Sequence, residues 1–212
     1  WQTLSEEKLE LIDSMGLKII HGIGEVQFGD YSDPGFFVSA ENALRSILAY
    51  SKNYDSIITY LIMNEPVPAF SANWEIQPMP LPGDAAEMVA YWDRIKTIIN
   101  EEHPGVPVSF SNTEFGNFVD MNLFHMSAFQ MYIWGSGANG HRHNYPGMVR
   151  WYTNQFPDNP LLITEFGLSV SPTGPGNLGY GGNTFAEQTE AFLYMYRSLI
   201  DGGAQGGAAF HY

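Results

Sequence analysis

The stretch IITYLIMNEP at residues 57–66 indicates the fold of this protein most clearly. Residues 57–63 form a nearly continuous apolar run, without the alternation of apolar and polar residues that marks a half-buried strand. Such a run is typical of a parallel strand that is buried on both faces of its sheet. The run ends at Asn64, Glu65 and Pro66. The sequence therefore predicts a buried strand with polar groups at its carboxyl end.

The same pattern recurs on both sides of this stretch. Strands are expected at residues 17–21, 57–63, 106–110, 128–133, 161–164 and 206–212, and helices at 3–15, 39–51, 84–103, 145–156 and 184–200. Three of the helix starts carry capping pairs, which are Thr3 with Glu6, Asp84 with Glu87 and Thr184 with Glu187. Strands that alternate with helices predict an α/β protein with a parallel sheet, either a barrel or an open doubly wound sheet.

The number of strands favours part of a barrel. About six strands are two fewer than a (β/α)8 TIM barrel contains, and no glycine-rich phosphate loop of the kind found in open sheets leads from a strand into a helix. The sequence begins at Trp1 without a Met and stops at Tyr212 within an apolar run. We therefore expect residues 1–212 to form a single partial barrel domain, roughly strands three to eight, that lacks its first two strands and belongs to a longer polypeptide.

Composition limits the partners of the protein. The 212 residues carry a formal net charge of −14 with only nine Lys and Arg residues. Nucleic acid and anionic membrane surfaces are bound through clustered Lys and Arg, so neither is an expected partner and a neutral ligand fits better. The absence of cysteine excludes disulfides and thiolate metal sites.

Polar side chains follow four of the expected strands. They are His21, Asn64 with Glu65, Asn112 with Glu114, and Glu165. In a parallel barrel the reacting groups lie at the carboxyl ends of the strands. Two carboxyl groups that face each other there can divide the work of glycoside hydrolysis, one as proton donor and one as nucleophile or base. The competing interpretation is that each glutamate pairs with an arginine or caps a helix.

Two of these strand ends carry a family resemblance. LIMNEP at residues 61–66 resembles the strand-four motif of the retaining glycoside hydrolases of clan A, and LITEFG at 162–167 resembles their strand-seven motif. The resemblance covers most of the chain and includes the family 2 and family 5 β-glycosidases. It implies that Glu65 is the general acid/base, that Glu165 is the nucleophile, and that Asn64 hydrogen-bonds the sugar 2-hydroxyl. It also implies an oligo- or polysaccharide substrate, with no cofactor and no metal.

The tetrapeptide TEFG occurs twice, at residues 113–116 and 164–167. Glu165 directly follows the strand residues LLIT at 161–164, and about two strands separate it from Asn64 and Glu65, which matches the placement in the family. Glu165 is therefore preferred over Glu114 as the nucleophile. Glu114 is expected to line the pocket or to bind an arginine.

Further residues are candidates for substrate binding. The resemblance implies that Tyr132 holds the nucleophile ionised and that His21 contacts the sugar, against a core tyrosine and a capping histidine as competing interpretations. Aromatic residues in loops at the rim could stack on sugar rings, namely Trp74, Trp134 and Tyr180. Trp92 and Trp151 are expected in the core, since both lie on apolar helical stripes.

Other functions stay open at this point. A transglycosidase would use the same mechanism, and a non-catalytic barrel could keep the glutamates to bind glycan or a protein. His141 and His143 suggest a metal-dependent hydrolase, although no third ligand lies nearby. The clan's strand-two arginine would precede Trp1, and its strand-eight tryptophan would lie at or beyond Tyr212.

Overall fold

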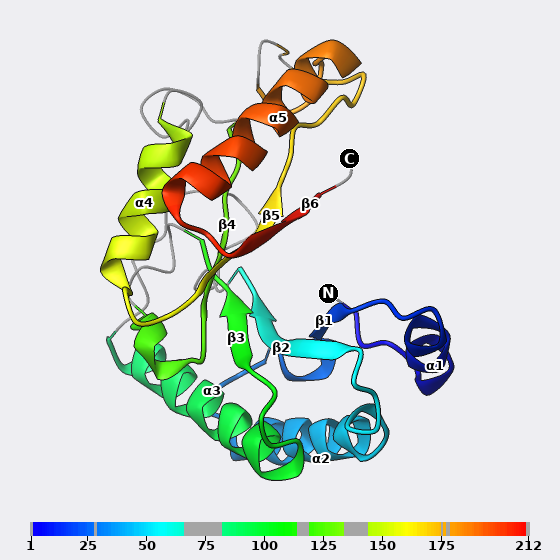
Figure 1. The fold of residues 1–212 in the computed structure, drawn as a ribbon. Coiled ribbons are helices and arrows are strands. Elements are labelled where there is room, and N and C mark those ends of the chain that lie inside the picture. The colour runs from blue at the N-terminus through cyan, green and yellow to red at the C-terminus, as the bar shows by residue number, and fades with distance from the viewer. Residues whose placement is uncertain are drawn as a thin grey trace. The chain divides into compact units, whose positions relative to one another are not determined.

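The computed structural model describes residues 2–27, 29–65, 82–113, 119–133, 144–174, 176 and 179–210. Strands and helices alternate along the chain, as the sequence predicts (Figure 1). In chain order they are α1 (Glu6–Ser14), β1 (Ile19–Gly22), η1 (Gly24–Val26), α2 (Pro34–Ser51), β2 (Ile57–Asn64), α3 (Pro82–Glu102), β3 (Val108–Ser111), η3 (Met121–Leu123), β4 (Ser127–Gln130), α4 (Tyr145–Gln155), β5 (Leu161–Phe166), α5 (Phe185–Gly202) and β6 (Gly206–Ala209).

The strands form two parallel sheets, each with its strands in chain order. One sheet is β1-β2-β3 and the other is β4-β5-β6. They belong to two compact units, Trp1–His125 and Met126–Tyr212. The α/β class with parallel strands is thus confirmed, whereas the strands of the described ranges do not close into a barrel. Each unit is a set of strand-helix-strand crossovers.

The core of the first unit lies between its sheet and the helices α2 and α3. Apolar residues at helical spacing on both helices are buried: Leu44, Ile47, Leu48, Met88, Tyr91, Trp92, Ile95 and Ile99. The Trp92 ring stacks on Phe110 of β3, with 4.8 Å between the ring centroids. The apolar stripes read from the sequence therefore face the sheet.

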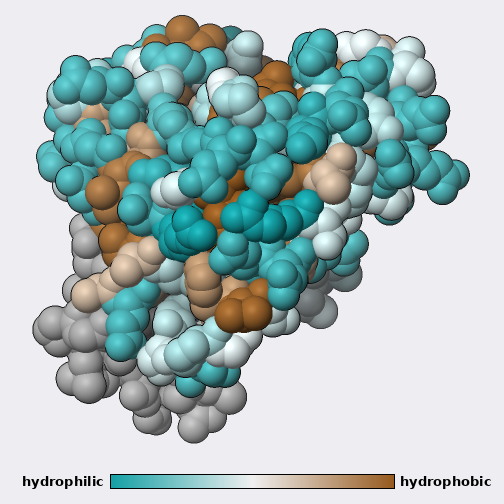
Figure 2. Space-filling model, turned by 90° about the horizontal axis from the view of Figure 1, so that it is seen from below, coloured by the Kyte–Doolittle hydropathy of each residue, from teal (hydrophilic) through white to brown (hydrophobic). Residues whose placement is uncertain are grey.

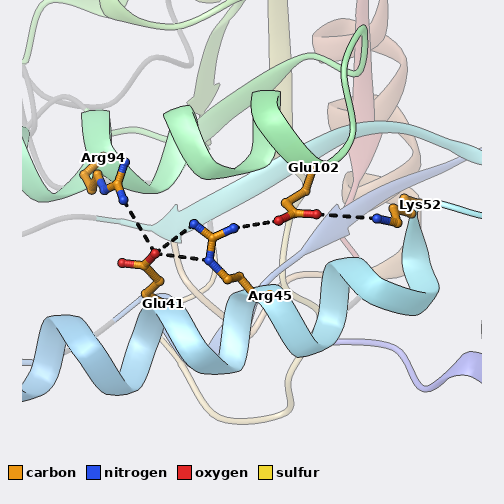
Figure 3. A network of polar contacts seen from close by, with 5 residues as sticks. All are labelled: Glu41, Arg45, Lys52, Arg94 and Glu102. Atoms are coloured by element: carbon orange, nitrogen blue, oxygen red, sulfur yellow. Dashed lines mark hydrogen bonds and ion pairs between the residues drawn. The ribbon is translucent and has the colours of Figure 1, made fainter.

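A network of ion pairs joins α2 to α3 on the outer side of the first unit (Figure 3). The Arg45 guanidinium lies 2.8 Å from the Glu41 carboxylate and 2.6 Å from that of Glu102. Arg94 approaches Glu41 at 3.5 Å and Lys52 approaches Glu102 at 3.4 Å. Because these side chains are partly exposed, water screens the ion pairs and they contribute little to stability.

In the second unit, α4 and α5 pack against each other and against the sheet. Phe129 of β4 stacks on Tyr152 of α4 at a centroid distance of 3.8 Å. Thr184 and Glu187 form the capping box that the sequence predicts at the start of α5. Gly203 ends this helix in the left-handed conformation, with φ at 86°, which glycine adopts without steric cost.

Three details of the helices differ from expectation. The residue that precedes α1 is Ser5, because the Thr3 hydroxyl contacts the Glu25 carboxylate and accepts a hydrogen bond from the Gly24 N–H instead of capping the helix. Helix α2 begins earlier than predicted, since the Asp33 side chain accepts from the Gly35 N–H and Pro34 suits a first helical position. Helix α3 begins at Pro82, so Asp84 lies inside it.

Helix α1 buries Leu9, whereas Leu11 and Met15 are exposed to 60% and 63%. The prediction that Trp151 lies in the core is wrong. Trp151 is exposed to 43%, because the next residue, Tyr152, takes the inward position on α4. The prediction for Trp92 is confirmed, since its side chain is fully buried.

The surface is largely hydrophilic where Figure 2 shows it, with hydrophobic residues in small separate patches. Within the described ranges, every helix is too short or too polar to cross a lipid bilayer.

Candidate active site

Glu165 lies at the carboxyl end of β5, where the sequence predicts a reacting group. Its side chain is 7% exposed, and its carboxylate accepts a hydrogen bond from the Tyr132 hydroxyl. Strand pairing produces this contact, because Gln130 of β4 is the register partner of Glu165 and the Met131 N–H donates to the Glu165 carbonyl at 2.9 Å. Tyr132 follows directly. The side chains of Tyr132 and Glu165 are therefore in contact, and their roles in catalysis stay a prediction.

The Tyr132 hydroxyl donates this hydrogen bond, and the Glu165 carboxylate oxygen accepts it. An ionised carboxylate is the form that can attack an anomeric carbon. On the other side of Tyr132 lies the ring of Phe210, edge to face at a centroid distance of 6.5 Å. The Phe210 N–H is bonded to the Phe166 carbonyl at 2.8 Å. The carboxyl ends of β4, β5 and β6 thus hold the Tyr132 ring and Glu165 together.

Glu65 follows the last residue of β2 and has an unusual backbone. Its φ is 47°, and among the described residues it is the only one other than glycine in the left-handed region. Its N–H donates to the Ser111 carbonyl on β3 at 2.9 Å, which ties the strained residue to the sheet. Such conformations cost on the order of 1–3 kcal/mol and gather at functional sites. The Glu65 side chain is exposed, while the preceding Asn64 is half-buried.

The two glutamates belong to different units. Glu65 lies in Trp1–His125 and Glu165 in Met126–Tyr212, and each is described within its own sheet. The pairing of their carboxyl groups stays a prediction.

His21 lies in a different environment from the one expected of a sugar ligand. It is fully buried, and its Nε2 accepts a hydrogen bond from the Leu4 N–H at 3.0 Å. Burial lowers the pKa of His21 to about 4, so the imidazole is neutral at pH 7. Its register partner is Tyr60, whose hydroxyl bonds Ser51 of α2 at 2.9 Å. His21 therefore lies on the helix side of the sheet, which supports the capping role.

Several predicted residues lie outside the described ranges. These are Trp74, Glu114, Trp134 and the histidines His141 and His143; the predictions for them stay predictions. Tyr180 is described, and 54% of it is exposed. In the part of the chain that is described, no group of three or more His, Asp or Glu side chains could hold a metal ion.

Asn183 is not among the residues that the sequence predicts for the site. This buried side chain donates hydrogen bonds within the glycine-rich segment that follows β5. An asparagine directly before the helix cap Thr184, at the end of a run of glycines, is the signal that could have revealed it.

Comparison with known proteins identifies solved structures that have a similar fold. No family model and no curated protein matches the chain. Among solved structures, Bacteroides uniformis β-glucuronidase matches 100% of this chain with a TM-score of 0.77 and 17% identity. The chain has the fold of part of a β-glucuronidase. The Bifidobacterium dentium enzyme, solved with coumarin-3-O-glucuronide, matches 99% of the chain with a TM-score of 0.76 and 15% identity.

A further match is β-glucuronidase from Ruminococcus gnavus, with a TM-score of 0.71 and 15% identity over 99% of this chain. The chain covers 25% of the Bacteroides enzyme, 33% of the Bifidobacterium enzyme and 36% of the Ruminococcus enzyme. It therefore spans only a quarter to a third of these β-glucuronidases, which belong to glycoside hydrolase family 2. At this low identity the likeness establishes the fold.

Proposed function

We propose that this chain forms strands three to eight of a (β/α)8 barrel that hydrolyses β-glycosidic bonds with retention of configuration. The observation that carries the proposal is the hydrogen bond from the Tyr132 hydroxyl to the buried Glu165 carboxylate. A buried carboxylate at a strand end with a donor aimed at it is prepared to be a nucleophile. The whole chain belongs to one catalytic domain in this proposal.

The reaction follows the double displacement of retaining glycosidases. Glu165 attacks the anomeric carbon while Glu65 gives its proton to the departing oxygen, and a glycosyl ester forms on Glu165. Glu65 then takes a proton from water, whose oxygen displaces Glu165 and releases the sugar. Asn64 is assigned to the sugar 2-hydroxyl. A sugar acceptor in place of water would make the same site a transglycosidase.

The position of Glu65 is compatible with the acid/base role. Its side chain is exposed, so it can exchange protons with water and substrate. Its backbone is held in the left-handed conformation by the bond to Ser111. A fixed backbone limits where the carboxyl group can reach, and positioning of this kind supports proton transfer.

The surface of α5 supports the completion of a barrel by further polypeptide. Besides the face buried against the sheet, α5 has a second apolar stripe of exposed residues at helical spacing, formed by Phe185, Leu193, Tyr196 and Ile200. Contiguous exposed apolar surface marks an interaction site. In the proposed barrel β6 is strand eight, and the helix that follows strand eight would cover this stripe.

The first substrates to examine are aryl β-glucuronides, because the matched enzymes are β-glucuronidases. The test is to incubate the longest polypeptide that contains this chain with activated 2-fluoro-glycosides, the glucuronide included. The labelled residue is then located by mass spectrometry. The proposal predicts a covalent label on Glu165 that is absent from Glu165→Gln.

The matched control is Glu187→Gln, which alters an exposed carboxylate in the capping box of α5 and should be labelled like the wild type. A label on Glu114 would reverse the assignment of the nucleophile. Glycan binding without any label would favour the non-catalytic barrel over the enzyme.

A further inference from the structure

The glycine-rich segment after β5 has a compact internal structure that the catalytic proposal does not use. The Asn183 side chain is 6% exposed and lies at its centre. Its amide nitrogen lies 2.9 Å from the Ser169 carbonyl oxygen, 2.6 Å from that of Gly179 and 3.2 Å from that of Gly181. The amide carries two hydrogens, so one of them is shared between two acceptors. One side chain thus joins both limbs of the loop.

The two limbs also pack backbone against backbone. The Gly176 N–H donates to the Gly181 carbonyl at 3.0 Å, and the Gly182 N–H donates to the Ser171 carbonyl. A Cβ atom on Gly181 would collide with the Thr173 carbonyl oxygen, and one on Gly174 would collide with the Tyr180 carbonyl oxygen. Glycine is required because the limbs approach too closely for side chains. The described part of this loop is therefore preformed in spite of its composition.

The loop begins beside the proposed nucleophile. Glu165 and Phe166 end β5, and Gly167 has no room for a Cβ because the Phe210 carbonyl lies in the way. The Leu168 carbonyl accepts a hydrogen bond from the Gln188 side chain of α5 at 2.7 Å, which anchors the base of the loop. Tyr180 follows on the far limb and is 54% exposed. The loop thus extends from the sheet edge that carries Glu165 and presents an aromatic side chain to solvent.

We propose that Asn183 is a positioning residue that fixes this loop so that Tyr180 offers its ring to the apolar face of a sugar bound at Glu165. The inference rests on the proposed function and adds a residue that governs substrate affinity. Aromatic faces in binding sites commonly contact the apolar parts of a ligand. A loop held in its bound shape saves the entropy of ordering it when the sugar binds. Asn183 acts through the loop and does not touch the sugar.

The first experiment measures the loop without any substrate. Amide hydrogen exchange is followed at Gly176 and Gly182 in the wild type, in Asn183→Ala and in Asn183→Ser, which keeps one donor. The matched control is Asn154→Ala, which alters an exposed asparagine of α4 in the same unit. Loss of the amide donors should speed exchange about tenfold or more in Asn183→Ala, less in Asn183→Ser and not at all in the control. Unchanged exchange in both Asn183 variants would overturn the positioning role.

The second experiment measures turnover of the glycoside that the wild-type polypeptide accepts. Asn183→Ala and Tyr180→Ala should both raise KM about tenfold while kcat stays within about threefold, because uniform binding is lost. Tyr180→Ala should leave the exchange of the loop amides unchanged, and Tyr180→Phe, which keeps the ring, should raise KM less. An unchanged KM in Tyr180→Ala would overturn the sugar contact.

The two failures can be told apart. If the wild type is neither labelled nor active on any glycoside, the proposed function fails and the sugar contact fails with it, while the exchange data still decide whether Asn183 holds the loop. If the wild type is active but loop exchange is unaffected by Asn183, only the present inference fails.

Discussion

The hydrogen bond between Tyr132 and Glu165 is the residue-level contact on which the catalytic proposal rests. A glutamate that directly follows an apolar strand is placed at the strand's carboxyl end by simple pattern, and the structure has it there, nearly buried. Its partner could be named only through the family resemblance. The contact depends on the register between β4 and β5, in which Gln130 pairs with Glu165 across a shift. No local pattern contains that information.

The hydroxyl of Tyr132 should matter for the chemical step more than for binding. In Tyr132→Phe, Glu165 loses a hydrogen bond to its charged form, which is worth about 1.5–3 kcal/mol, so kcat should fall about tenfold to a hundredfold with little change in KM. Steady-state kinetics on an aryl β-glycoside measure this effect.

The control is Tyr145→Phe. The Tyr145 hydroxyl is also buried, but it donates to the Met131 carbonyl at 2.8 Å and not to Glu165. Its removal should lower stability by about 1 kcal/mol without changing the rate per folded molecule. An equal loss of kcat in both variants would mean that Tyr132 acts only through packing.

His21 shows what the sequence could not predict. A histidine at a strand end can face either the helices or the interior of a barrel, and its contacts with Leu4 and Tyr60 come from segments far away in the chain. In the folded protein the His21 imidazole is buried and neutral. Its pKa is lowered from 6.5 to about 4, first by burial and against the attraction of Glu25.

This shift predicts a dependence of stability on pH. Above pH 6.5 the imidazole is neutral in both states, and its contribution to stability is fully present. As the pH falls from 6.5 toward 4, the unfolded chain takes up a proton that the folded chain refuses, and the free energy of unfolding drops by at most about 3 kcal/mol. Urea titrations at several pH values measure this slope.

His21→Gln is the matched variant, because a glutamine oxygen can still accept from the Leu4 N–H but does not titrate. Its free energy of unfolding should depend less on pH than that of the wild type across this window. Parallel curves for the two proteins would show that His21 titrates normally in the folded state.

At the scale of elements, the order of strands and helices could be predicted almost completely. Long apolar runs and helical apolar stripes largely determine which segments become strands and helices. The apolar stripes of α2 and α3 are the buried faces of these helices. The predictions that were wrong concern the first residues of helices, because a single side-chain contact can determine where a helix begins. Thr3 is a plausible cap by sequence, yet its hydroxyl is occupied by Glu25 and the Gly24 N–H. Capping patterns cannot foresee a competing tertiary partner.

The packing of α4 on α5 depends on Gly202. A Cβ at this position would collide with the side chain of Val149, which is branched at Cβ and cannot rotate away. We expect Gly202→Ala to push the helices apart and to lower the free energy of unfolding by about 1–3 kcal/mol. Urea denaturation, followed by circular dichroism, measures the change.

Gly206→Ala is the control for that prediction. A Cβ there would meet Leu162 at 3.5 Å, an ordinary contact distance, and should change the free energy of unfolding by no more than about 0.5 kcal/mol. Equal effects at Gly202 and Gly206 would show that α4 and α5 do not pack as closely as described.

At the scale of the whole molecule, the sequence predicts about six parallel strands as part of one barrel. In the structure the described strands form two parallel sheets, one in each unit. The assembly of the units could not be predicted because it depends on contacts between residues far apart in the chain. The exposed apolar stripe on α5 belongs to this scale as well, since it concerns what the molecule binds.

The stripe should contribute little to the stability of this chain by itself. Leu193→Gln together with Ile200→Gln should change the free energy of unfolding by about 0.5 kcal/mol or less per site, while reducing self-association in sedimentation velocity. Leu199→Ala, on the buried face of the same helix, should cost about 2–5 kcal/mol. A comparable loss in the double variant would show that the stripe is already packed.

In the proposed mechanism, Glu65 and Glu165 act on the same anomeric centre. A crystal structure of the longest polypeptide that contains this chain would give the distance between the two carboxyl groups directly. We predict a distance of about 5–5.5 Å, the separation found in retaining glycosidases. A separation well beyond that, or a Glu65 side chain on a different face of the molecule from Glu165, would contradict it.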